Sequence, residues 1–395
     1  MIDGSLPGFD FSTAGTIRFG RGLASVSDSF SAVQRSRVFL LTGSDPGRHE
    51  ATREAIASVA TEVCMAQLEV EPDTSEIRRL VDHARSCGAG GVVAIGGGSV
   101  MDAGKVIAAL LTNTDDLFSY LEIIGDGKPL AHEPVPYIAV PTTAGTGSEV
   151  TRNAVIGSRE HGVKVSMRSQ SMLPAVALVD PELCLSLPER PTVLSGLDAA
   201  TQLIEAFTSR HAQPLTDALC RDGLEHFAWG FEPAVAHAKS DRGSALATEE
   251  DRRARGRMCV AALFSGLALA NAKLGAVHGF AGPLGGMIHA PHGALCATLL
   301  PEVTRMNLAM VDENIRSRYA RVTEILFGPD ISVDELPAQL DAIRTAYRVP
   351  GLRELGLTPD RYEEASEKAS RAGSMKGNPV TYSVDQLAGI LERSA

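Results

Sequence analysis

The chain has 395 residues, of which 44% are hydrophobic and 22% are charged, as is typical of a globular protein. A single hydrophobic core stops growing below this length, so we expect two domains. The net charge of −11 disfavours nucleic acid or an anionic membrane surface as a partner. Because no apolar stretch approaches the roughly 18 residues that a membrane span needs, we expect no such span.

The chain start and the cysteines favour a cytoplasmic protein. Residues 1–15 lack the basic and apolar regions of a signal peptide. The six cysteines are scattered without CxxC spacing, which predicts reduced thiols rather than a disulfide framework. They are Cys64, Cys87, Cys184, Cys220, Cys259 and Cys296.

Strand-like and helix-like segments alternate in the first half of the chain. Short apolar runs of strand character occur at residues 37–41, 91–95, 137–140 and 176–179. Helical patterns lie between them, for example at residues 75–88 and 101–113. This alternation predicts a Rossmann-like α/β domain, in which helices cover both faces of a doubly wound parallel sheet.

Three prolines in DPELCLSLPERP, residues 180–191, mark the predicted domain boundary. Beyond it almost every pattern is helical, including residues 192–211, 215–238, 248–273 and 333–347. We therefore expect the α/β domain at residues 1–187 and an all-helical domain at residues 188–395.

The segment VVAIGGGSVMDAGK, residues 92–105, predicts a phosphate-binding turn. An apolar strand ends in three glycines, and Ser99 stands at the expected N-cap of a helix that begins with Val100. Backbone N–H groups and the helix dipole favour an anion there, and glycines allow its close approach. The segment is neither GxGxxG nor a P-loop, so a tight turn without a ligand is the alternative.

A second glycine-rich segment, PTTAGTGSEV, follows the strand-like run at residues 137–140. Its hydroxyl groups are spaced among glycines and suit a ribose or a nicotinamide amide. They belong to Thr142, Thr143, Thr146 and Ser148.

Four polar residues in the second half form a candidate metal site. Asp198 and Gln202 lie four apart in GLDAATQLIEAF and would share one helix face. His278 and His292 bracket a stretch rich in glycine and proline that can fold back on itself. A carboxylate, an amide oxygen and two imidazoles suit Fe²⁺, Zn²⁺ or Mn²⁺. Two buried histidines and a capping aspartate are the structural alternative.

Together these segments resemble the iron-containing (group III) alcohol dehydrogenase family. Six motifs occur in family order over residues 15 to 395, namely GGGSVMDAGK, PTTAGTGSEVT, LVDPEL, GLDAATQLIEAF, VHGFAGPLGG…APHG and SMKGNPV. The resemblance implies a dinucleotide-binding α/β domain, an all-helical domain, and a metal and a nicotinamide in the cleft between them. It also implies a homodimer.

The resemblance assigns roles to residues of the glycine-rich segments. Gly97, Gly98 and Ser99 would hold the pyrophosphate, and Asp102 would lie beside the nicotinamide. Thr142, Thr143 and Ser148 would contact nucleotide and ribose, and Lys164 would reach a ribose. Asp198, His278 and His292 match three family metal ligands.

Two positions depart from the family pattern. Gln202 stands where the family has a histidine ligand, so the site is either Asp/Gln/His/His or three protein ligands plus water. Gly282 stands where the family has a proton-relay histidine, and His289 is a candidate replacement. Cys296 lies four residues after His292 and is either a ligand or a small buried residue.

The loop after the first predicted strand bears on cofactor preference. Family members that prefer NAD often carry an acid where this chain has Gly43 and Ser44, and an acid would repel a 2′-phosphate. This chain lacks the acid at that position, and Ser44 could donate a hydrogen bond to the phosphate while Arg48 supplies a nearby positive charge. These residues favour either NADPH or the use of both NADPH and NADH.

The resemblance implies hydride transfer between the nicotinamide and a small aldehyde or oxo-acid carbonyl bound to the divalent metal. Arg152 could meet an acidic group on such a substrate. The alternatives are a metal-free reductase similar to maleylacetate reductases, a lyase similar to dehydroquinate synthases, and a nucleotide-binding relative without catalysis.

Overall fold

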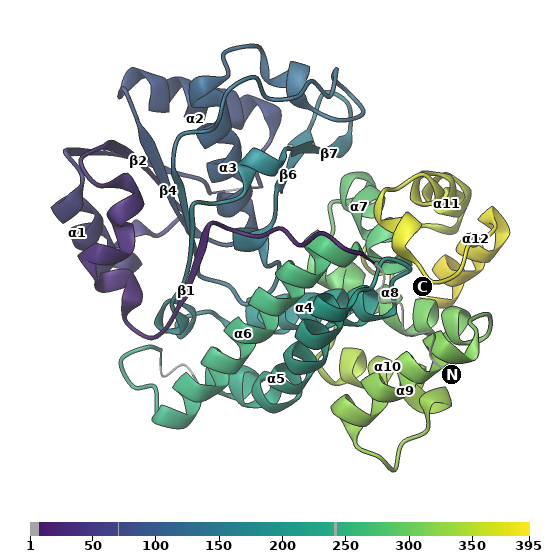
Figure 1. Ribbon diagram of the computed structural model, residues 1–395. Coiled ribbons are helices and arrows are strands. Elements are labelled where there is room, and N and C mark those ends of the chain that lie inside the picture. Colours follow the sequence, from purple (N-terminus) through teal and green to yellow (C-terminus); the bar gives the residue numbers. More distant parts are fainter. Residues whose placement is uncertain (1–7, 70, 241–242) are drawn as a thin grey trace.

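A computed structural model of this protein describes residues 8–69, 71–240 and 243–395. A sheet-containing region is followed by a helical region, and the two lie side by side (Figure 1). The strands are β1 (Thr16–Phe19), β2 (Arg37–Thr42), β3 (Glu62–Gln67), β4 (Gly91–Gly96), β5 (Tyr137–Pro141), β6 (Asn153–Ser158), β7 (Val163–Arg168) and β8 (Val176–Val179).

Six strands form one parallel sheet in the order β1-β8-β5-β4-β2-β3. The chain moves outward from β2 to β3 and then returns to the other side of β2 with β4. This reversal creates a switch point between β2 and β4, where ligands bind at the carboxyl ends of strands in such sheets. The predicted glycine-rich loop therefore begins at the site that the topology favours.

Helices cover both faces of the sheet, which confirms the predicted doubly wound class. Alternate residues of each strand point to opposite faces. Val92 and Ala94 of β4 pack under α2 (Thr74–Ser86) and α3 (Gly98–Thr112). Val93 and Ile95 pack under α1 (Glu50–Val59) and the short helix η2 (Ser27–Val33).

The sequence patterns located four of the six parallel strands but missed β1, β3 and the antiparallel hairpin β6–β7. β1 and β3 are edge strands with partly exposed residues, so their apolar pattern is weak. The predicted N-cap at Ser99 was also wrong. Gly97 is the N-cap, and α3 begins at Gly98, which places Ser99 inside the first turn.

The second region is helical, as predicted, and its helices share one hydrophobic core. They are α4 (Glu189–Thr208), α5 (Pro214–Lys239), α6 (Glu249–Ala272), α7 (Ala276–Ile288), α8 (His292–Leu308), α9 (Glu313–Phe327), α10 (Leu336–Ala346), α11 (Tyr362–Ser370) and α12 (Val384–Arg393). α4 lies between α5, α6 and α8, and most of its residues are buried. The predicted boundary after residue 187 falls between β8 and α4.

The two regions are joined by more than the covalent connection. Gly147, in the second glycine-rich loop, has φ of 60° and lies directly against Gly266 of α6. A Cβ on Gly266 would come within 2.3 Å of the Gly147 carbonyl oxygen. The backbone of Ser12 also exchanges hydrogen bonds with the Asn271 side chain of α6. The loop and α6 therefore form a tight junction.

The structure corrects the prediction for one cysteine pair. Cys64 of β3 and Cys87, at the end of α2, form a disulfide, because folding brings their Cα atoms to 6.4 Å across 23 residues of sequence. The other four cysteines are free and buried. Within the described ranges, no single helix is long and apolar enough to cross a membrane. α6 and α7 reach such a length together only across a bend of 99°.

Candidate functional site

Three polar residues on one face of α4 begin the site. Asp198, Gln202 and Glu205 are spaced at i, i+4 and i+7, which places them on the same side of a helix. All three are buried, with at most 5% of each residue exposed. Burial of three polar side chains on one helix face requires partners, and the neighbouring helices supply them.

The two predicted histidines lie at the N-terminal ends of consecutive helices. His278 is in the first turn of α7, and His292 is the first residue of α8. α7 ends in a left-handed residue, His289, with φ of 52°, and Pro291 precedes α8. This reversal brings the two imidazole rings to a centroid distance of 5.3 Å.

Four side chains converge on one point. His278 Nε2 and His292 Nε2 lie 3.3 and 3.6 Å from Asp198 Oδ1. Cys296, one turn after His292 on α8, places its Sγ 3.7 and 3.6 Å from the same two nitrogens. The four atoms all lie within 4.8 Å of one another. Carboxylate, imidazole and thiolate groups are the usual ligands of a divalent transition metal.

The carboxylate of Asp198 offers a buried oxygen that a cation could bind. Its Oδ1 atom is buried, and no donor in the described part of the chain meets it with hydrogen-bond geometry. Burial raises the pKa of Asp198, but His292 and His278 outweigh burial and hold this pKa below its ordinary value. A buried ionised oxygen needs a positive partner, so the donor set fits a metal ion.

Glu205 holds His278 from behind and was missed from sequence. Its Oε2 accepts a hydrogen bond from His278 Nδ1 at 2.6 Å, and its Oε1 accepts from the Val277 backbone N–H at 2.7 Å. In a neutral ring with the proton on Nδ1, the Nε2 lone pair would face the cluster, as in most protein metal sites. Burial lowers the pKa of His278, but Cys296, Asp198 and Glu205 raise it well above its ordinary value. The spacing from Asp198 to Glu205 was the available signal.

Gln202 lies beside Asp198, and its role as a metal ligand stays a prediction. Its Nε2 donates to Asp198 Oδ2 at 3.1 Å, and its Oε1 lies 2.7 Å from Ser265 Oγ, which also lies 2.8 Å from the Ala262 carbonyl oxygen. The amide oxygen therefore faces a hydroxyl group of α6. Gln202 fixes the orientation of the Asp198 carboxylate.

The predicted relay residue, His289, does not bond to the cluster in the described part of the chain. His289 is exposed at the end of α7, and within the described ranges it makes no hydrogen bond or ion pair with Asp198, His278 or His292. Gly282, in the middle of α7, is also exposed, and a Cβ there would meet nothing within 4 Å. The helix therefore has room for a side chain where the family has its histidine.

The two glycine-rich loops lie side by side at the carboxyl ends of β4 and β5. Thr142 donates its N–H to the Gly96 carbonyl oxygen at 2.9 Å. Cβ atoms on Gly97 and Gly98 would lie 3.3 Å from Thr143 and 2.9 Å from Thr146. No side chain caps the N-terminus of α3, and such uncapped backbone N–H groups suit a phosphate. Gly97, Gly98, Ser99, Thr142 and Thr143 are all partly exposed here.

Asp102 and Ser148 bind each other instead of standing free. Ser148 Oγ donates to Asp102 Oδ1 at 2.6 Å, and Asp102 Oδ2 accepts from the Val155 backbone of β6. The buried Lys105 joins them, with its Nζ 2.7 Å from Ser148 Oγ and 3.3 Å from Asp102 Oδ1. Burial lowers the pKa of Lys105 and raises the pKa of the neighbouring Glu149 to about 7. This network ties α3, the second loop and the hairpin together.

The remaining predicted residues lie around this junction. Lys164 of β7 pairs with Glu71 at 2.6 Å, and its Nζ lies 3.6 Å from where a Cβ on Gly285 of α7 would stand. Gly43 and Ser44 follow β2 at the switch point and are at least partly exposed. The Arg48 guanidinium donates a hydrogen bond to the Ser186 carbonyl oxygen at 2.8 Å. Arg152 is exposed and bonds to Gln170.

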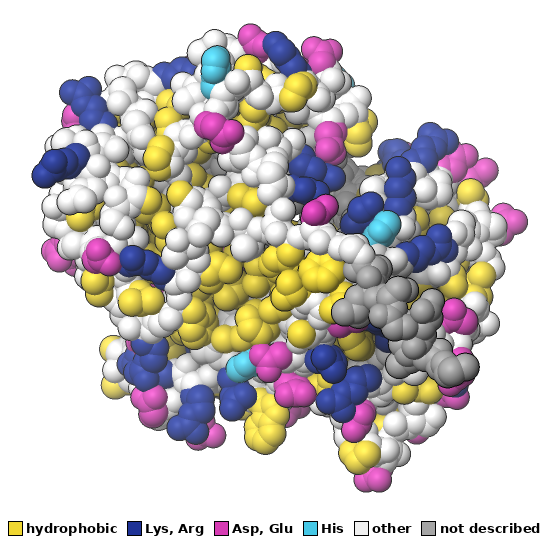
Figure 2. Space-filling view, in the orientation of Figure 1, with side chains coloured by type: hydrophobic (Ala, Val, Ile, Leu, Met, Phe, Trp, Pro, Cys, Tyr) yellow, Lys and Arg dark blue, Asp and Glu magenta, His cyan; other side chains and the backbone are white. Residues whose placement is uncertain are grey.

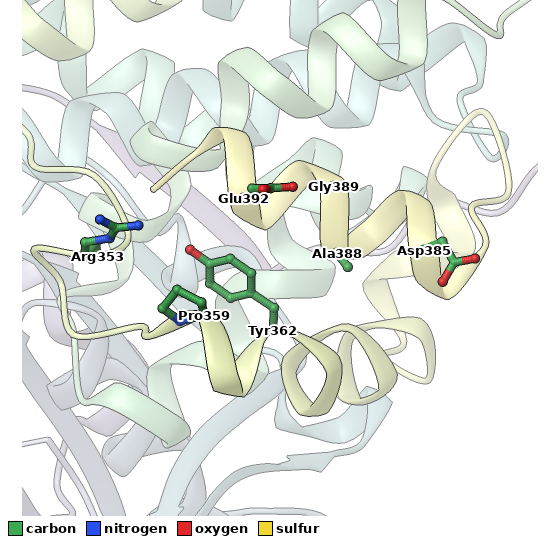
Figure 3. Close-up of a pocket in the computed structure, with 7 residues that line it drawn as sticks. All are labelled: Arg353, Pro359, Tyr362, Asp385, Ala388, Gly389 and Glu392. Carbon is green, nitrogen blue, oxygen red and sulfur yellow. The ribbon is translucent and has the colours of Figure 1, made fainter.

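Figure 2 shows a hollow between the sheet-containing region and the C-terminal helices, with Lys and Arg side chains on both sides. A separate pocket lies beside α12, lined by Arg353, Pro359, Tyr362, Asp385, Ala388, Gly389 and Glu392 (Figure 3). It contains none of the converging donors or glycine-rich residues, so it is not the candidate site.

Comparison with known proteins gives the same family over both regions. Residues 14–181 match the family described as "Iron-containing alcohol dehydrogenase", and residues 192–395 match "Fe-containing alcohol dehydrogenase family, C-terminal". Alcohol dehydrogenase 4 of Saccharomyces cerevisiae is 34% identical over 304 residues, which cover 77% of this chain and 75% of that protein.

Solved structures agree along nearly the whole chain. A 1,3-propanediol oxidoreductase superposes with a TM-score of 0.87 at 29% identity, covering 98% of this chain and 100% of that one. A sulfoacetaldehyde reductase from Bifidobacterium kashiwanohense, solved in complex with NAD⁺, superposes with a TM-score of 0.84 at 28% identity, covering 98% of each chain.

Proposed function

We propose that this chain, which belongs to the iron-containing alcohol dehydrogenase family, reduces a small aldehyde or oxo-acid or oxidises the corresponding alcohol. As a member it is an NAD-linked, metal-dependent oxidoreductase that acts on alcohols. The observation that carries the proposal for this site is the convergence of Asp198, His278, His292 and Cys296 around an orphaned carboxylate oxygen.

Asp198, His278 and His292 hold the metal in this proposal. When bound, the ion polarises the substrate oxygen and stabilises negative charge that develops on it. Glu205 orients His278, and Gln202 orients Asp198. These two contacts supply the preorganisation that such a site needs, because neither ligand can then rotate away from the cluster.

The glycine-rich loops bind the nicotinamide cofactor. Gly97, Gly98 and Ser99 hold the pyrophosphate at the N-terminus of α3, and Thr142 and Thr143 contact the nucleotide. Lys164 reaches a ribose from β7. Its position next to Gly285 of α7 supports this role, because it places the side chain between the sheet-containing and helical regions. Asp102 and Ser148 hold the nearby backbone in place through their mutual hydrogen bond. In this proposal that structural role comes first, and their contact with the cofactor is an additional role.

We favour NADPH, or the use of both cofactors, over NADH alone. A Cβ on Gly43 would meet nothing within 4 Å, so the position directly after β2 has room for a phosphate, and neither Gly43 nor Ser44 carries an acid that would repel it. Fe²⁺, Zn²⁺ and Mn²⁺ are the candidate metals. With Gly282 at the relay position, the proton would come from solvent, a cofactor hydroxyl or His289, which is exposed at the end of α7.

We also propose a homodimer in the cytoplasm. Four of the six cysteines are free thiols, which favours this compartment, whereas the Cys64–Cys87 disulfide argues against it. β1 is an edge strand that pairs only with β8 among the described strands. Figure 2 shows a band of apolar side chains across the face that carries β1 and α6. Phe19, at the end of β1, is 43% exposed. An unpaired edge beside apolar surface favours a two-fold interface. Sedimentation and cell fractionation test these two proposals.

The first experiment measures metal content in protein purified without chelator and screens NADPH and NADH oxidation over small aldehydes and oxo-acids. About one Fe, Zn or Mn per chain with aldehyde-dependent oxidation supports the proposal. Nucleotide binding without metal or turnover contradicts it and favours a metal-free reductase or a relative without catalysis.

A further inference from the structure

We propose that Cys296, and not Gln202, supplies the fourth side-chain donor of the metal centre, which makes it an Asp/His/His/Cys site suited to Zn²⁺. The inference rests on the proposed function, because it concerns the same metal centre. It changes the chemistry of that centre, since a thiolate replaces the imidazole that the family carries in the position of Gln202.

The position of Cys296 on α8 supports a ligand role. It lies one turn after His292, so the two side chains emerge from the same face of the helix. Its Sγ is nearly equidistant from the Nε2 atoms of His278 and His292, at 3.7 and 3.6 Å. Donor atoms that bind one ion are separated by comparable distances, and the substrate oxygen would take a fifth position on the ion. Cys296 is fully buried, so its sulfur has no solvent contact.

The two oxygens of Asp198 are divided between different partners. Oδ1 faces the histidine nitrogens and lacks a hydrogen-bond donor among the described residues, whereas Oδ2 accepts from Gln202 Nε2. Gln202 therefore contacts the carboxylate oxygen that the two histidines do not. Its contact orients Asp198 and leaves the ligand position beside Oδ1 to the thiol.

The hydrogen bonds of Gln202 also determine which way its amide faces. With the present orientation, Oε1 accepts from Ser265 and Nε2 donates to Asp198. The opposite orientation would place the amide oxygen 3.1 Å from Asp198 Oδ2, with two acceptors facing each other and no hydrogen between them. The amide oxygen thus faces Ser265, and the amide nitrogen faces Asp198.

Metal binding at this centre converts the Cys296 thiol to a thiolate. The ion forms a bond to Sγ, and the thiol proton leaves to solvent, so one proton is released per ion from this residue. Thiolate ligands favour Zn²⁺ over Fe²⁺ and Mn²⁺, because Fe²⁺ and Mn²⁺ bind most protein sites more weakly than the later divalent metals of the first transition row do. We therefore expect the purified protein to carry mainly zinc.

Cobalt substitution tests the donor set directly. The full-length protein is depleted of metal under anaerobic conditions that leave the Cys64–Cys87 disulfide intact, so that Cys64 and Cys87 offer no thiolate. It is then titrated with Co²⁺, whose thiolate complexes show a charge-transfer band in the near-ultraviolet. The expected result is one Co²⁺ per chain with this band, and displacement of Co²⁺ by Zn²⁺. Cys296→Ser should lose the band while still binding Co²⁺ more weakly through Asp198, His278 and His292.

Two further variants separate the roles. Gln202→Met should keep the band but bind about 10- to 100-fold more weakly, because it loses only the contact that orients Asp198. Cys220→Ser is the matched control, since Cys220 is buried in α5 outside the cluster and its band should be unchanged. Co²⁺ binding without a thiolate band would overturn this inference and leave the proposed function standing. Absence of Co²⁺ binding in every variant would overturn both.

Discussion

Replacing Glu205 by glutamine should weaken metal binding without touching a ligand. The Glu205 carboxylate receives two short hydrogen bonds, 2.6 Å from His278 Nδ1 and 2.7 Å from the Val277 N–H. A glutamine keeps one acceptor oxygen, and its NH₂ group then faces one of these two donors. Losing one hydrogen bond to a charged group costs about 1.5–3 kcal/mol.

The consequence for the metal follows from the freedom that His278 gains. Without a carboxylate at Nδ1, the ring can turn and its Nε2 is less basic. Removal of such a partner typically lowers metal affinity about 10- to 100-fold. This corresponds to about 1.4–2.7 kcal/mol of binding free energy. A competition titration of Zn²⁺ against a chromophoric chelator measures the change, and thermal unfolding of the metal-free protein measures stability alongside it.

Asp180→Asn is the matched control. Asp180 is also a buried carboxylate that accepts backbone N–H bonds, from Gly22 and Ala24, but it lies at the end of β8 outside the cluster. It should lower the unfolding temperature and leave Zn²⁺ affinity unchanged. Unchanged affinity in Glu205→Gln, or an equal loss in Asp180→Asn, would refute the reasoning.

Four other changes give distinct outcomes. Asp198→Ala should abolish metal binding and most turnover; retained metal with a near-normal rate would contradict the site assignment. Gly282→His should fold normally, since a Cβ there meets nothing within 4 Å, and should add a group titrating near pH 6.5 to the pH profile of kcat/KM. An unchanged profile would count against a relay role. Gly266→Ala should destabilise the protein by about 1–3 kcal/mol, because its Cβ would lie 2.3 Å from the Gly147 carbonyl oxygen; an unchanged unfolding midpoint would show that this junction yields easily. Burial raises the pKa of Glu149 from 4.5 to about 7, so its contribution to stability is full below pH 4.5 and is lost as the pH rises through 7, by up to about 3 kcal/mol. Glu149→Gln should flatten this decline in unfolding free energy between pH 5 and 8, and an identical slope in both proteins would rule out the assigned titration.

The sequence by itself predicted the features that depend on neighbouring residues. Apolar runs identified β2, β4, β5 and β8, because buried strands are short and continuously hydrophobic. The glycines after β4 predicted the anion-binding turn, and helical spacing placed Asp198 and Gln202 on one face. Each of these conclusions needs only the local geometry of a strand, a turn or a helix.

Tertiary structure decided which of these residues meet and what they do. Glu205 and its partner His278 are 73 residues apart, and Gln202 and Ser265 are 63 apart. No periodicity relates such pairs, since their contact depends on how α4, α6 and α7 pack. The same packing brought Gln202 into a hydrogen bond with Asp198 and brought Cys296 to the cluster. Local sequence patterns predict which face of a helix or strand a side chain lies on. Which side chain it contacts there depends on the order of the packed helices and strands and on the angles between them.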